Sequence, residues 1–476
     1  MSAAEHVQTG ASSKFFTPSD EAMRILIINY EFPPIGAGGG QASQKIAECL
    51  VEMGHTVRVV TSRPSQLYSL MGSVSLFMGF GFWVYLTYAK LSWGEDISDH
   101  GFTILGTLLL LSGFILHTMG LVWELIMPIR GLKRVEFIHG VEVHRVPVFR
   151  QRQDYCSTFE MASFLLSAAW YCLFNVREFR PDIVHVFFGV PDGPLGWLLK
   201  RLYRLPYVVS LRGADVPSDE VKRFARHYKL LRPFITYLWR DADALVAVSN
   251  GLRSHAEKVA PDIPIQVIPN AIDLSQFTPP RQRDTQGPVQ LLYVGRFTAA
   301  KNVETLIEAV YLLSRREVGD FELELVGEGE TRPRLEHLVA ERGLTRRVRF
   351  TDWVPRDQIA DYYRRADIFV TATTWEGMPN TVLEAMACGL PIVGTQVPGL
   401  QELVHDTVNG YLVPPRDPGA LADALALLVD NGYERRRMGR QSRLMAERQF
   451  AWEYIAAQYV EVYRRVLERS GRNAAH

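Results

Sequence analysis

The segment 366–393 constrains the fold of this chain more than any other stretch. Residues 366–373 (ADIFVTAT) form a short run rich in apolar and β-branched side chains, and Gly377 and Pro379 interrupt it. An Asn-Thr pair suited to begin a helix follows, and Gly389 with the proline after it suits the end of that helix. The pattern predicts a strand, a loop, a helix and a strand. The loop then lies at the carboxyl end of a strand, where open α/β sheets bind ligands.

Two glutamates stand out in this segment. Glu376 falls in the predicted loop, and Glu384 falls one turn into a predicted helix whose other residues are almost all apolar. A buried carboxylate is costly unless it accepts hydrogen bonds. A vicinal diol such as a ribose offers two O–H donors, and the free N–H groups of the helix suit a diphosphate. These residues alone leave two interpretations open: a nucleotide site, or a Glu384 satisfied by an arginine or by the backbone.

Length and composition indicate a globular enzyme of two or three domains. The 476 residues are 47% hydrophobic and 22% charged, and the formal net charge of zero argues against a partner that is a nucleic acid. The four cysteines have no paired spacing, which favours a reducing compartment and does not suggest a zinc site. The first 22 residues lack the apolar core of a signal peptide, and we expect a loose tail.

The beginning of the chain predicts a βαβ unit. Two strand-like runs, 24–29 (RILIIN) and 56–61 (TVRVVT), enclose a glycine-rich loop and an amphipathic helix. Gly39 and Gly40 would let the backbone approach a ligand closely before a helix N-terminus, although a tight turn is the other interpretation. The loop lacks the glycine spacing and the later acidic residue of a dinucleotide site.

A second unit begins after a polar, proline-containing linker. Residues 289–294 (VQLLYV) predict a strand, and Gly295, Arg296 and Lys301 lie between it and a helix over 303–314. Two cations beside a helix N-terminus can neutralise a diphosphate without a metal, whereas solvated surface charges are the alternative.

Two long uncharged stretches interrupt the first unit. No Asp, Glu, Lys or Arg occurs in 64–89 or in 101–123, and each stretch is long enough to cross about 30 Å of hydrocarbon. Basic residues flank the pair on the outside and a mostly acidic segment separates them, so we expect both outer ends in the cytoplasm. The pattern predicts a two-helix transmembrane hairpin inserted at 64–128, and therefore a location in the inner, cytoplasmic membrane. Buried soluble helices or a re-entrant, interfacial hairpin are the alternatives.

The E-x7-E formed by Glu376 and Glu384, with AMACGLPIV after it, closely resembles the signature of the family 4 (group 1) retaining glycosyltransferases. The G-R-x4-K of residues 295–301 and a glycine turn at Gly327 resemble the same family. The likeness extends over 24–467 except for the insertion. It implies the GT-B fold, in which two doubly wound, Rossmann-like α/β domains face one cleft.

The resemblance also implies domain boundaries. We expect the loose tail at 1–22, an N-terminal acceptor-side domain at 23–284, a C-terminal nucleotide-sugar domain at 285–449, and a helix at 450–476 that crosses back to the first domain.

Residue roles follow from the same resemblance. Glu384 is expected to hold the nucleotide ribose, Glu376 to face the hydroxyls of the donor sugar, and Arg296 with Lys301 to clamp the diphosphate. The remaining donor-binding candidates are backbone or loop positions: Gly39, Gly40, Gly295, Gly327, Gly377, Met378, Pro379 and Asn380. The resemblance implies no metal and no cofactor, since the nucleotide-diphosphate sugar is a substrate.

The sequence departs from the family after the strand predicted at 207–211. The family more often has a histidine followed by an aspartate there, and in the usual form the histidine meets the donor sugar. This chain has Arg212 and Asp215. Both are candidate catalytic residues, and a structural Arg–Asp pair in a turn is the other interpretation. The Asp-x-Asp of Asp241 and Asp243 resembles the metal site of the other large glycosyltransferase fold, but its position before a strand favours a helix end.

The sequence therefore predicts a retaining, metal-independent glycosyltransferase that moves a hexose-type sugar from a nucleotide sugar to an acceptor. The predicted hairpin adds the hypothesis of a membrane-borne acceptor, such as a lipid-linked glycan in polysaccharide or glycolipid biosynthesis. A nucleotide-sugar epimerase, a phosphorylase and a non-catalytic membrane scaffold are the alternatives.

Overall fold

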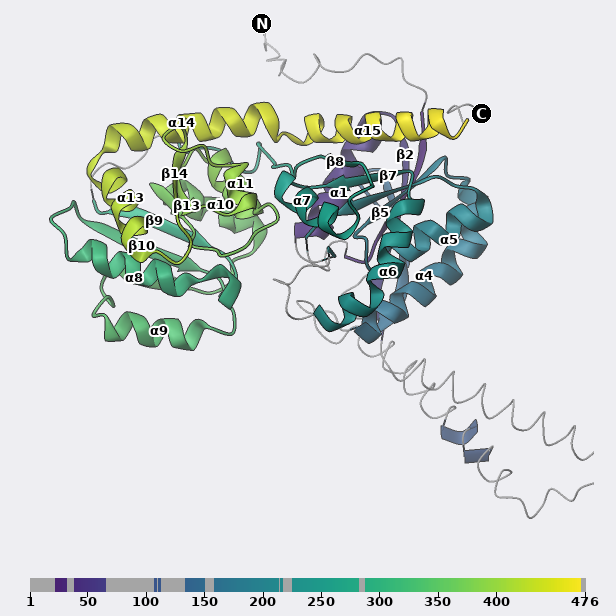
Figure 1. The fold of residues 1–476 in the computed structure, drawn as a ribbon, viewed down its shortest axis with the longest axis horizontal. Coiled ribbons are helices and arrows are strands. Elements are labelled where there is room, and N and C mark those ends of the chain that lie inside the picture. Colours follow the sequence, from purple (N-terminus) through teal and green to yellow (C-terminus); the bar gives the residue numbers. More distant parts are fainter. Residues whose placement is uncertain are drawn as a thin grey trace, which may run out of the picture.

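The protein folds into two α/β halves that lie side by side (Figure 1). The computed structural model describes residues 22–31, 38–65, 107–108, 110–112, 133–149, 158–213, 215–216, 225–281 and 287–471. Each half is built on one sheet, and the first sheet has eight strands and the second six.

The first sheet has the strand order β3-β4-β2-β1-β5-β6-β7-β8. All neighbouring strands are parallel except β3 and β4. The strands are β1 (Arg24–Asn29), β2 (Thr56–Ser65), β3 (Val135–Ile138), β4 (Val141–Phe149), β5 (Ile183–Phe187), β6 (Tyr207–Leu211), β7 (Ala244–Ala247) and β8 (Ile265–Val267). The order reverses between β1 and β5, which makes that place the topological switch point of this half.

Helices cover both faces of the first sheet because its central strands are apolar on both sides. Leu26 and Ile28 of β1 pack with α4, α5, α6 and α7, whereas Ile25 and Ile27 pack with α1 and α15. The helices of this half are α1 (Gly38–Glu52), α4 (Thr158–Phe179), α5 (Gly193–Tyr203), α6 (Ala225–Asp241) and α7 (Asn250–Val259).

The second sheet is wholly parallel, in the order β11-β10-β9-β12-β13-β14, so its switch point lies between β9 and β12. Its strands are β9 (Val289–Val294), β10 (Phe321–Val326), β11 (Val348–Thr351), β12 (Ile368–Val370), β13 (Ile392–Thr395) and β14 (Gly410–Val413). Its helices are η1 (Ala299–Lys301), α8 (Val303–Ser314), α9 (Arg332–Glu341), α10 (Arg356–Arg365), α11 (Asn380–Ala387), α12 (Pro398–Gln401) and α13 (Pro418–Asp430).

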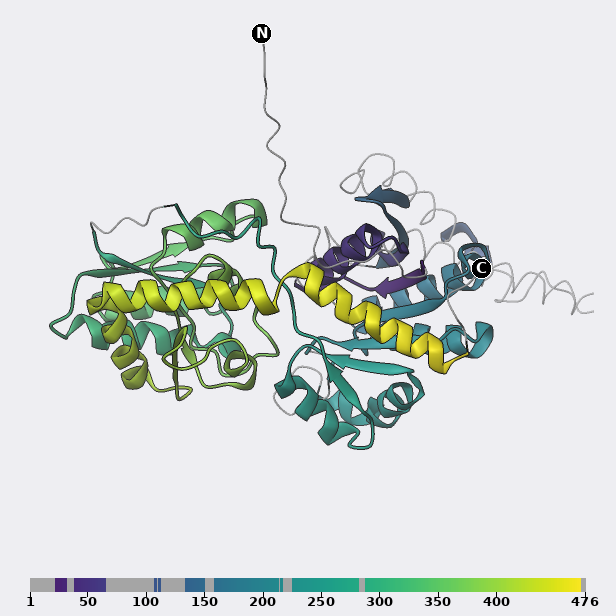
Figure 2. The same cartoon turned by 90° about the horizontal axis from the view of Figure 1, so that it is seen from above.

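The last two helices connect the halves. α14 (Gly432–Gln449) lies on the second half, and α15 (Trp452–Arg469) continues from it across the first, as the view from above shows (Figure 2). Ile272 donates its backbone N–H to the Phe450 carbonyl at 2.8 Å, just where the chain crosses over. Tyr459 and Tyr463 of α15 are fully buried in the core of the first half.

Two doubly wound halves were predicted from the sequence, and the structure confirms them. The strand predicted at 366–373 is shorter, with only Ile368–Val370 in the ladder. The residues after it turn toward the β9 loop, where Thr374 donates its N–H to the Ala300 carbonyl at 2.9 Å.

The predicted membrane hairpin at 64–128 lies almost wholly outside the described residues. Residues 64–65 end β2, and the only other described residues in this range, 107–108 and 110–112, are helical. Within the described part of the chain no helix combines the length and the apolar character needed to cross a bilayer. That finding corrects the predicted location in the cytoplasmic membrane: the prediction was wrong because it rested on the sequence pattern of this insertion.

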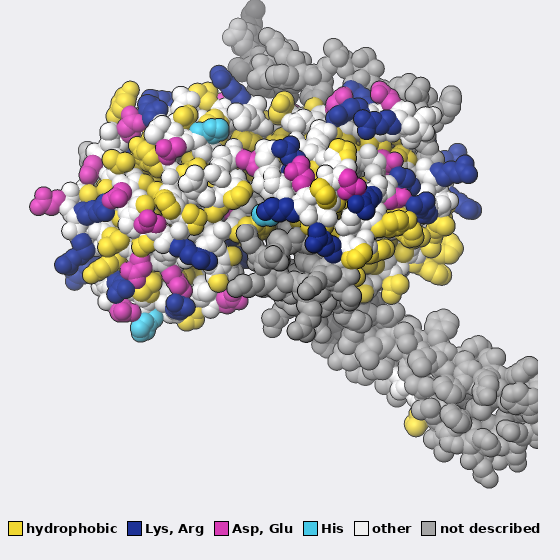
Figure 3. All heavy atoms as spheres, in the orientation of Figure 1, with side chains coloured by type: hydrophobic (Ala, Val, Ile, Leu, Met, Phe, Trp, Pro, Cys, Tyr) yellow, Lys and Arg dark blue, Asp and Glu magenta, His cyan; other side chains and the backbone are white. Residues whose placement is uncertain are grey.

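The surface carries charges of both signs, interspersed across the face seen in Figure 3. Hydrophobic side chains gather on the first half, on the side where α4 and α5 lie. On α4, Leu166, Trp170 and Phe174 recur every four residues and are 75%, 69% and 64% exposed. They therefore form one apolar stripe along the outer side of that helix.

Candidate functional site

The candidate site of the second half lies at its switch point. The loop that follows β9 and the loop that follows β12 leave the sheet at the same edge, because β9 and β12 are parallel neighbours. The two loops touch through backbone and side-chain hydrogen bonds from Thr373 and Thr374 to the Ala300 carbonyl. Residues separated by about 75 positions in the sequence, such as Lys301 and Glu376, are thereby brought together.

An ion pair joins the predicted diphosphate cation to the predicted sugar-facing acid. Lys301 Nζ donates to Glu376 Oε1, and their side chains are 23% and 14% exposed. Arg296 is exposed at the start of the same loop, and no ion pair or hydrogen bond of its side chain is found within the described ranges. The site thus holds one cation and one acid that satisfy each other, and a second cation exposed to solvent.

Glu384 lies inside α11 and is only 8% exposed. Its Oε2 accepts a hydrogen bond from the Tyr363 hydroxyl at 2.7 Å. Burial raises the pKa of Glu384, while the charge of Arg356 and the Tyr363 hydrogen bond oppose that rise. The sequence predicted an anchored carboxylate but missed Tyr363. The buried face of α10, with Ile359 one turn before Tyr363, was the available signal.

Glycines allow the loops of this site to pack backbone against backbone. A Cβ added at Gly327, where φ is +143°, would lie 2.1 Å from the Gly295 carbonyl oxygen. One added at Gly399 would lie 2.6 Å from the Glu376 carbonyl oxygen and 2.7 Å from that of Gly377. The structure therefore brings Gly295 together with Gly327 at one end of the site, and residues 376–377 lie at the other.

The two halves meet at the loop that carries Glu376. The side chain of Asn270, which follows β8, donates to the Met378 carbonyl at 3.3 Å and to Asn380 Oδ1 at 3.0 Å. Asn270 Oδ1 in turn accepts from Arg212 Nη1 at 2.7 Å. Sequence analysis did not single out Asn270, whose role depends on contacts with residues more than a hundred positions away.

A second contact between the halves lies at the start of α7. Glu402, which follows α12, accepts the backbone N–H groups of Asn250 at 2.9 Å and Gly251 at 3.0 Å. A carboxylate from one half thus satisfies free donors at a helix N-terminus of the other.

Asp215 and Arg212 lie at the carboxyl edge of the first sheet and do not form an ion pair with each other. Asp215 is 2% exposed and accepts the backbone N–H groups of Gly189 at 2.7 Å, Arg212 at 2.9 Å and Gly213 at 2.8 Å. Burial raises the pKa of Asp215, and these hydrogen bonds oppose the rise. Its carboxylate therefore fixes the turn after β6.

Gly39 and Gly40 belong to the first turn of α1, which begins at Gly38 after the carboxyl end of β1. Residues 32–37, which connect β1 to α1, lie outside the described residues. Ser43 Oγ donates to the Gly40 carbonyl at 2.8 Å. The structure thus places the N-terminus of α1 at the same sheet edge as the turn after β6.

The Asp-x-Asp pair has other partners. Asp243 binds Lys200 Nζ at 2.9 Å and the backbone N–H of Tyr207 at 2.9 Å, and Asp241 binds Arg201 at 2.7 Å. These contacts tie the end of α6 to α5 and β6, as expected for a helix end.

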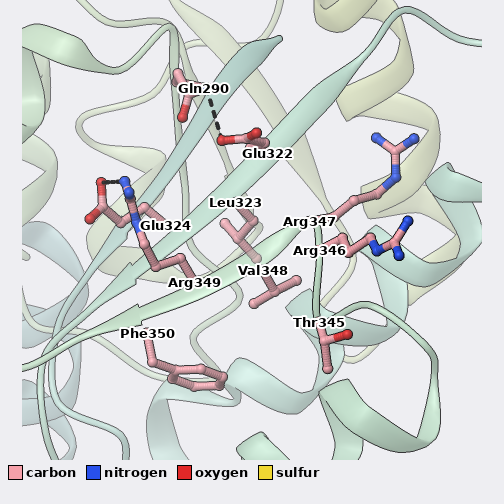
Figure 4. A pocket seen from close by; sticks show the side chains of 10 residues that line it. All are labelled: Gln290, Glu322, Leu323, Glu324, Thr345, Arg346, Arg347, Val348, Arg349 and Phe350. Carbon is pink, nitrogen blue, oxygen red and sulfur yellow. Dashed lines mark hydrogen bonds and ion pairs between the residues drawn. The ribbon is translucent and has the colours of Figure 1, made fainter.

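A surface hollow over β9, β10 and β11 lies apart from these loops (Figure 4). Two pairs of its lining residues bind each other: Arg349 forms an ion pair with Glu324 at 3.0 Å, and the Gln290 side-chain amide donates to Glu322 at 3.4 Å. Gln290 stands near the amino end of β9, whereas the candidate loops leave the carboxyl end. We therefore do not assign the candidate site to this hollow.

Comparisons with known proteins show the family and the fold of this chain. Residues 276–445 match the profile of the group 1 glycosyl transferases, and residues 117–271 match that of the glycosyl transferase 4-like domain. The D-inositol 3-phosphate glycosyltransferase of Xylanimonas cellulosilytica is 31% identical over 322 residues, which cover 60% of this chain and 73% of that protein.

Two solved structures show the same fold. Sucrose-phosphate synthase from Thermosynechococcus elongatus is similar with a TM-score of 0.70 at 20% identity, over 94% of this chain and 100% of that one. HepE of Anabaena, in complex with UDP-glucose, has a TM-score of 0.61 at 17% identity, over 92% and 98% of the two chains.

Proposed function

The chain belongs to the group 1 glycosyl transferases and has their two-domain GT-B architecture. We propose that it transfers a hexose-type sugar with retention of configuration, without a metal or cofactor. The donor is a nucleotide sugar. The observation that carries the proposal is the ion pair of Lys301 with Glu376, which joins the loops after β9 and β12 at the switch point of the second sheet. Arg296 is exposed on the first of these loops, and Glu384 lies one turn into the helix that follows the second. Two cations suit a diphosphate, and two acids suit the hydroxyls on either side of it.

The proposed chemistry follows from the charges. The bond between the sugar C1 and the diphosphate oxygen breaks, which leaves positive character on the sugar and negative charge on the diphosphate. Arg296 and Lys301 stabilise that negative charge as it develops. Lys301 must exchange Glu376 for the phosphate, and the exchange leaves Glu376 able to accept hydrogen bonds from the sugar.

Retention is proposed through attack on the face that the diphosphate leaves. The acceptor oxygen forms the new bond to C1, and its proton goes to a phosphate oxygen of the leaving group. A double displacement would instead need a carboxylate on the opposite face. Asp215 is bound by three backbone N–H groups, and Glu376 is proposed to accept hydrogen bonds from the sugar hydroxyls, so neither of these two acids is assigned to the opposite face, which favours the single-face path.

A nucleotide screen tests the donor site. The wild type, Glu384→Ala and Arg296→Ala would be heated with UDP-, GDP- and ADP-sugars, with Arg349→Ala in the distant hollow as the matched control. A donor at 100 times its Kd stabilises the fold by about 2.7 kcal/mol. We expect sugars of one nucleotide class to raise the Tm of the wild type and of the control, and to leave the Tm of the two site variants unchanged.

Three results would contradict the proposal. No shift with any donor would favour a non-catalytic scaffold. Release of free nucleotide with no acceptor present would indicate an epimerase, and a requirement for free phosphate would indicate a phosphorylase. UDP-glucose is the first donor to test, because HepE was solved with it.

For the acceptor we propose a lipid-linked glycan of polysaccharide or glycolipid biosynthesis. The exposed apolar stripe of Leu166, Trp170 and Phe174 supports it. Trp170→Ser with Phe174→Ser should lower transfer to a polyprenyl-linked acceptor and leave transfer to its water-soluble analogue unchanged. Trp353→Ser, which removes an exposed tryptophan of the second half, is the control. Equal losses on both acceptors would contradict the lipid-linked acceptor.

A further inference from the structure

Arg212 lies where the two halves meet. It follows the carboxyl end of β6, and its Nη1 donates to Asn270 Oδ1 at 2.7 Å, the residue whose amide binds the loop of Glu376. A Cβ added at Gly377 would lie 3.6 Å from the Arg212 carbonyl oxygen, and one at Gly213 would lie 3.5 Å from the Trp375 ring. The backbone of Arg212 therefore faces the loop that carries Glu376.

Two guanidinium nitrogens of Arg212, which carry three N–H groups, have no acceptor within the described part of the chain. Nε and Nη2 of Arg212 are buried, and neither finds a hydrogen-bond partner among the described residues. A buried donor without an acceptor costs about 1–3 kcal/mol, and more when the group is charged. An unsatisfied buried group of this kind calls for an explanation, and a ligand that accepts hydrogen bonds from both nitrogens supplies one.

The neighbours of the guanidinium do not neutralise it. It lies over the Phe187 ring, with 4.8 Å between Cζ and the ring centroid. His185 adds no negative charge, and burial together with the charge of Arg212 lowers its pKa well below the usual value. Asp215 gives its oxygens to three backbone N–H groups, and Glu376 is paired with Lys301.

The geometry of the free groups selects the ligand. Nε and Nη2 lie on the same side of a guanidinium and form the planar fork that binds two oxygens of a carboxylate or a phosphate. Arginine keeps its positive charge at every physiological pH, so a neutral hydroxyl would satisfy the hydrogen bonds and leave the charge unpaired.

We propose that Arg212 binds a carboxylate or phosphate group of a sugar substrate, separate from the diphosphate that Arg296 and Lys301 hold. The proposal rests on the proposed glycosyl transfer and makes Arg212 its specificity-determining residue. The anion has two sources: the transferred sugar of the donor, as in a nucleotide-activated uronic acid, or the acceptor.

Protein atoms enclose Nε and Nη2 of Arg212. Arg212 as a residue is partly exposed, whereas Nε and Nη2 are buried. An anion therefore reaches them when the side chain turns or when the contact of Asn270 with residues 378–380 opens. Both changes break hydrogen bonds, such as those from Asn270 to Met378 and Asn380 at 3.3 and 3.0 Å, that the anion replaces.

The donor source is tested by calorimetry on the full chain. Kd values for UDP-glucose and UDP-glucuronate would be compared in the wild type, Arg212→Gln and the surface control Arg240→Gln; GDP-mannose and GDP-mannuronate replace them if the protein selects guanine. We expect the wild type and the control to prefer the uronate by about 10- to 100-fold, the range of one charge-assisted contact. Arg212→Gln should bring the two donors to nearly equal affinity.

The acceptor source is tested with the nucleotide site filled. The protein saturated with UDP (or the nucleotide it selects) would be titrated with glucose, glucuronate and glucose 6-phosphate. If the acceptor carries the anion, the two donors bind alike, and the wild type binds the charged sugars about 10-fold tighter than glucose. Arg212→Gln should remove that preference. If Arg212→Gln changes the anion preference in neither experiment, the proposal is wrong.

A melting experiment separates this role from a structural one. Replacing a buried cation that has unsatisfied N–H groups should leave the Tm of the ligand-free protein unchanged or raise it, and should remove the stabilisation by the anion. A lower Tm with unaltered anion preference would make Arg212 structural. Failure of every nucleotide to bind the wild type would instead overturn the proposed function, while nucleotide binding without an effect of Arg212→Gln overturns only this inference.

Discussion

The carboxyl edges of the two sheets differ in how they hold charge. In the second half Lys301 pairs with Glu376, and Arg296 is exposed to solvent. In the first half Asp215 is bound by three backbone N–H groups, and Arg212 has two nitrogens without an acceptor among the residues that the structure describes. Two sheets of similar topology have therefore become different kinds of site. In the proposals above, one exchanges an ion pair for its ligand, and the other fixes a turn and uses one cation to bind an anion.

Exposure explains why only one edge can exchange partners at low cost. The Lys301 and Glu376 side chains remain 23% and 14% exposed, so water and ligand can replace the pair. Asp215 is 2% exposed, and its backbone donors have no substitute acceptor. Substitutions in the second half should then lower the rate of transfer, and those at Asp215 should lower stability.

The largest effect is expected from Lys301→Met. Loss of one fixed cation near the leaving diphosphate should lower kcat by about 10²- to 10³-fold, with Tm nearly unchanged. Steady-state kinetics with the donor that the protein selects would measure it. Lys45→Met, which removes a partly exposed lysine paired with Glu48, is the control. A normal kcat for Lys301→Met would show that the second edge does not act on the leaving group.

Asp215→Ala should mainly lower the stability of the protein, in contrast to Lys301→Met, which should mainly lower kcat. It leaves three buried N–H groups without an acceptor, and we expect a loss of about 3 kcal/mol in the free energy of unfolding. Urea denaturation would measure that loss. Glu376→Ala, the matched change at the other edge, should cost less than about 1 kcal/mol. Full stability with no activity in Asp215→Ala would make Asp215 a catalytic residue and remove the contrast.

The pH dependence of donor binding should report on Glu384. Burial raises its pKa, so the side chain takes up a proton at a higher pH than an ordinary glutamate. A protonated carboxyl accepts the ribose hydroxyls less well, and donor affinity should fall about tenfold per pH unit below that pKa. The same shift makes Glu384 favour folding below its pKa, and this contribution declines as pH rises through it.

Calorimetric Kd values from about pH 8 to about pH 5 would test this, with Glu384→Gln as the comparison. The variant should bind weakly at every pH. If the wild-type profile persists in Glu384→Gln, another group titrates and the ribose assignment loses its support.

Glu402→Ala should have the smallest effect. It removes the acceptor for two N–H groups at the start of α7, but these groups are near solvent, and we expect a loss of about 0.5–1 kcal/mol. Since the contact joins the halves, the ligand-free protein should also become less compact in small-angle X-ray scattering. An unchanged scattering profile would show that Asn270 and the crossover alone hold the halves together.

The sequence predicted what local pattern determines. The strand, loop and helix around Glu376 and Glu384 are specified by residues that are neighbours in the sequence, and so are β9 and the glycine turn after it. Tyr363 beside Glu384 and Asn270 beside Met378 depend on contacts across the fold, which no local spacing encodes. The unsatisfied Nε and Nη2 of Arg212 depend on which described residues surround them in the folded chain, and no sequence pattern specifies that.

Two long helices were missed for opposite physical reasons. α4 has apolar side chains on nearly every side, including the exposed Trp170, so its helical period is weak. α14 is so rich in arginine and glutamate that few apolar residues mark its buried face. The uncharged stretches at 64–89 and 101–123 show the reverse error, since composition alone led to the predicted location that the described helices contradict.

The crossover of α15 sets an order of events during synthesis. One face of the first sheet is completed by Tyr459, Tyr463 and their neighbours, although its last strand ends at Val267. A ribosome adding about 5–20 residues per second needs roughly 10–40 s to make the intervening chain. During that interval α1 covers part of this face, and the part that α15 will cover stays exposed. The second half can fold in the meantime, and we expect the exposed apolar part to make the nascent chain prone to aggregation until α15 emerges.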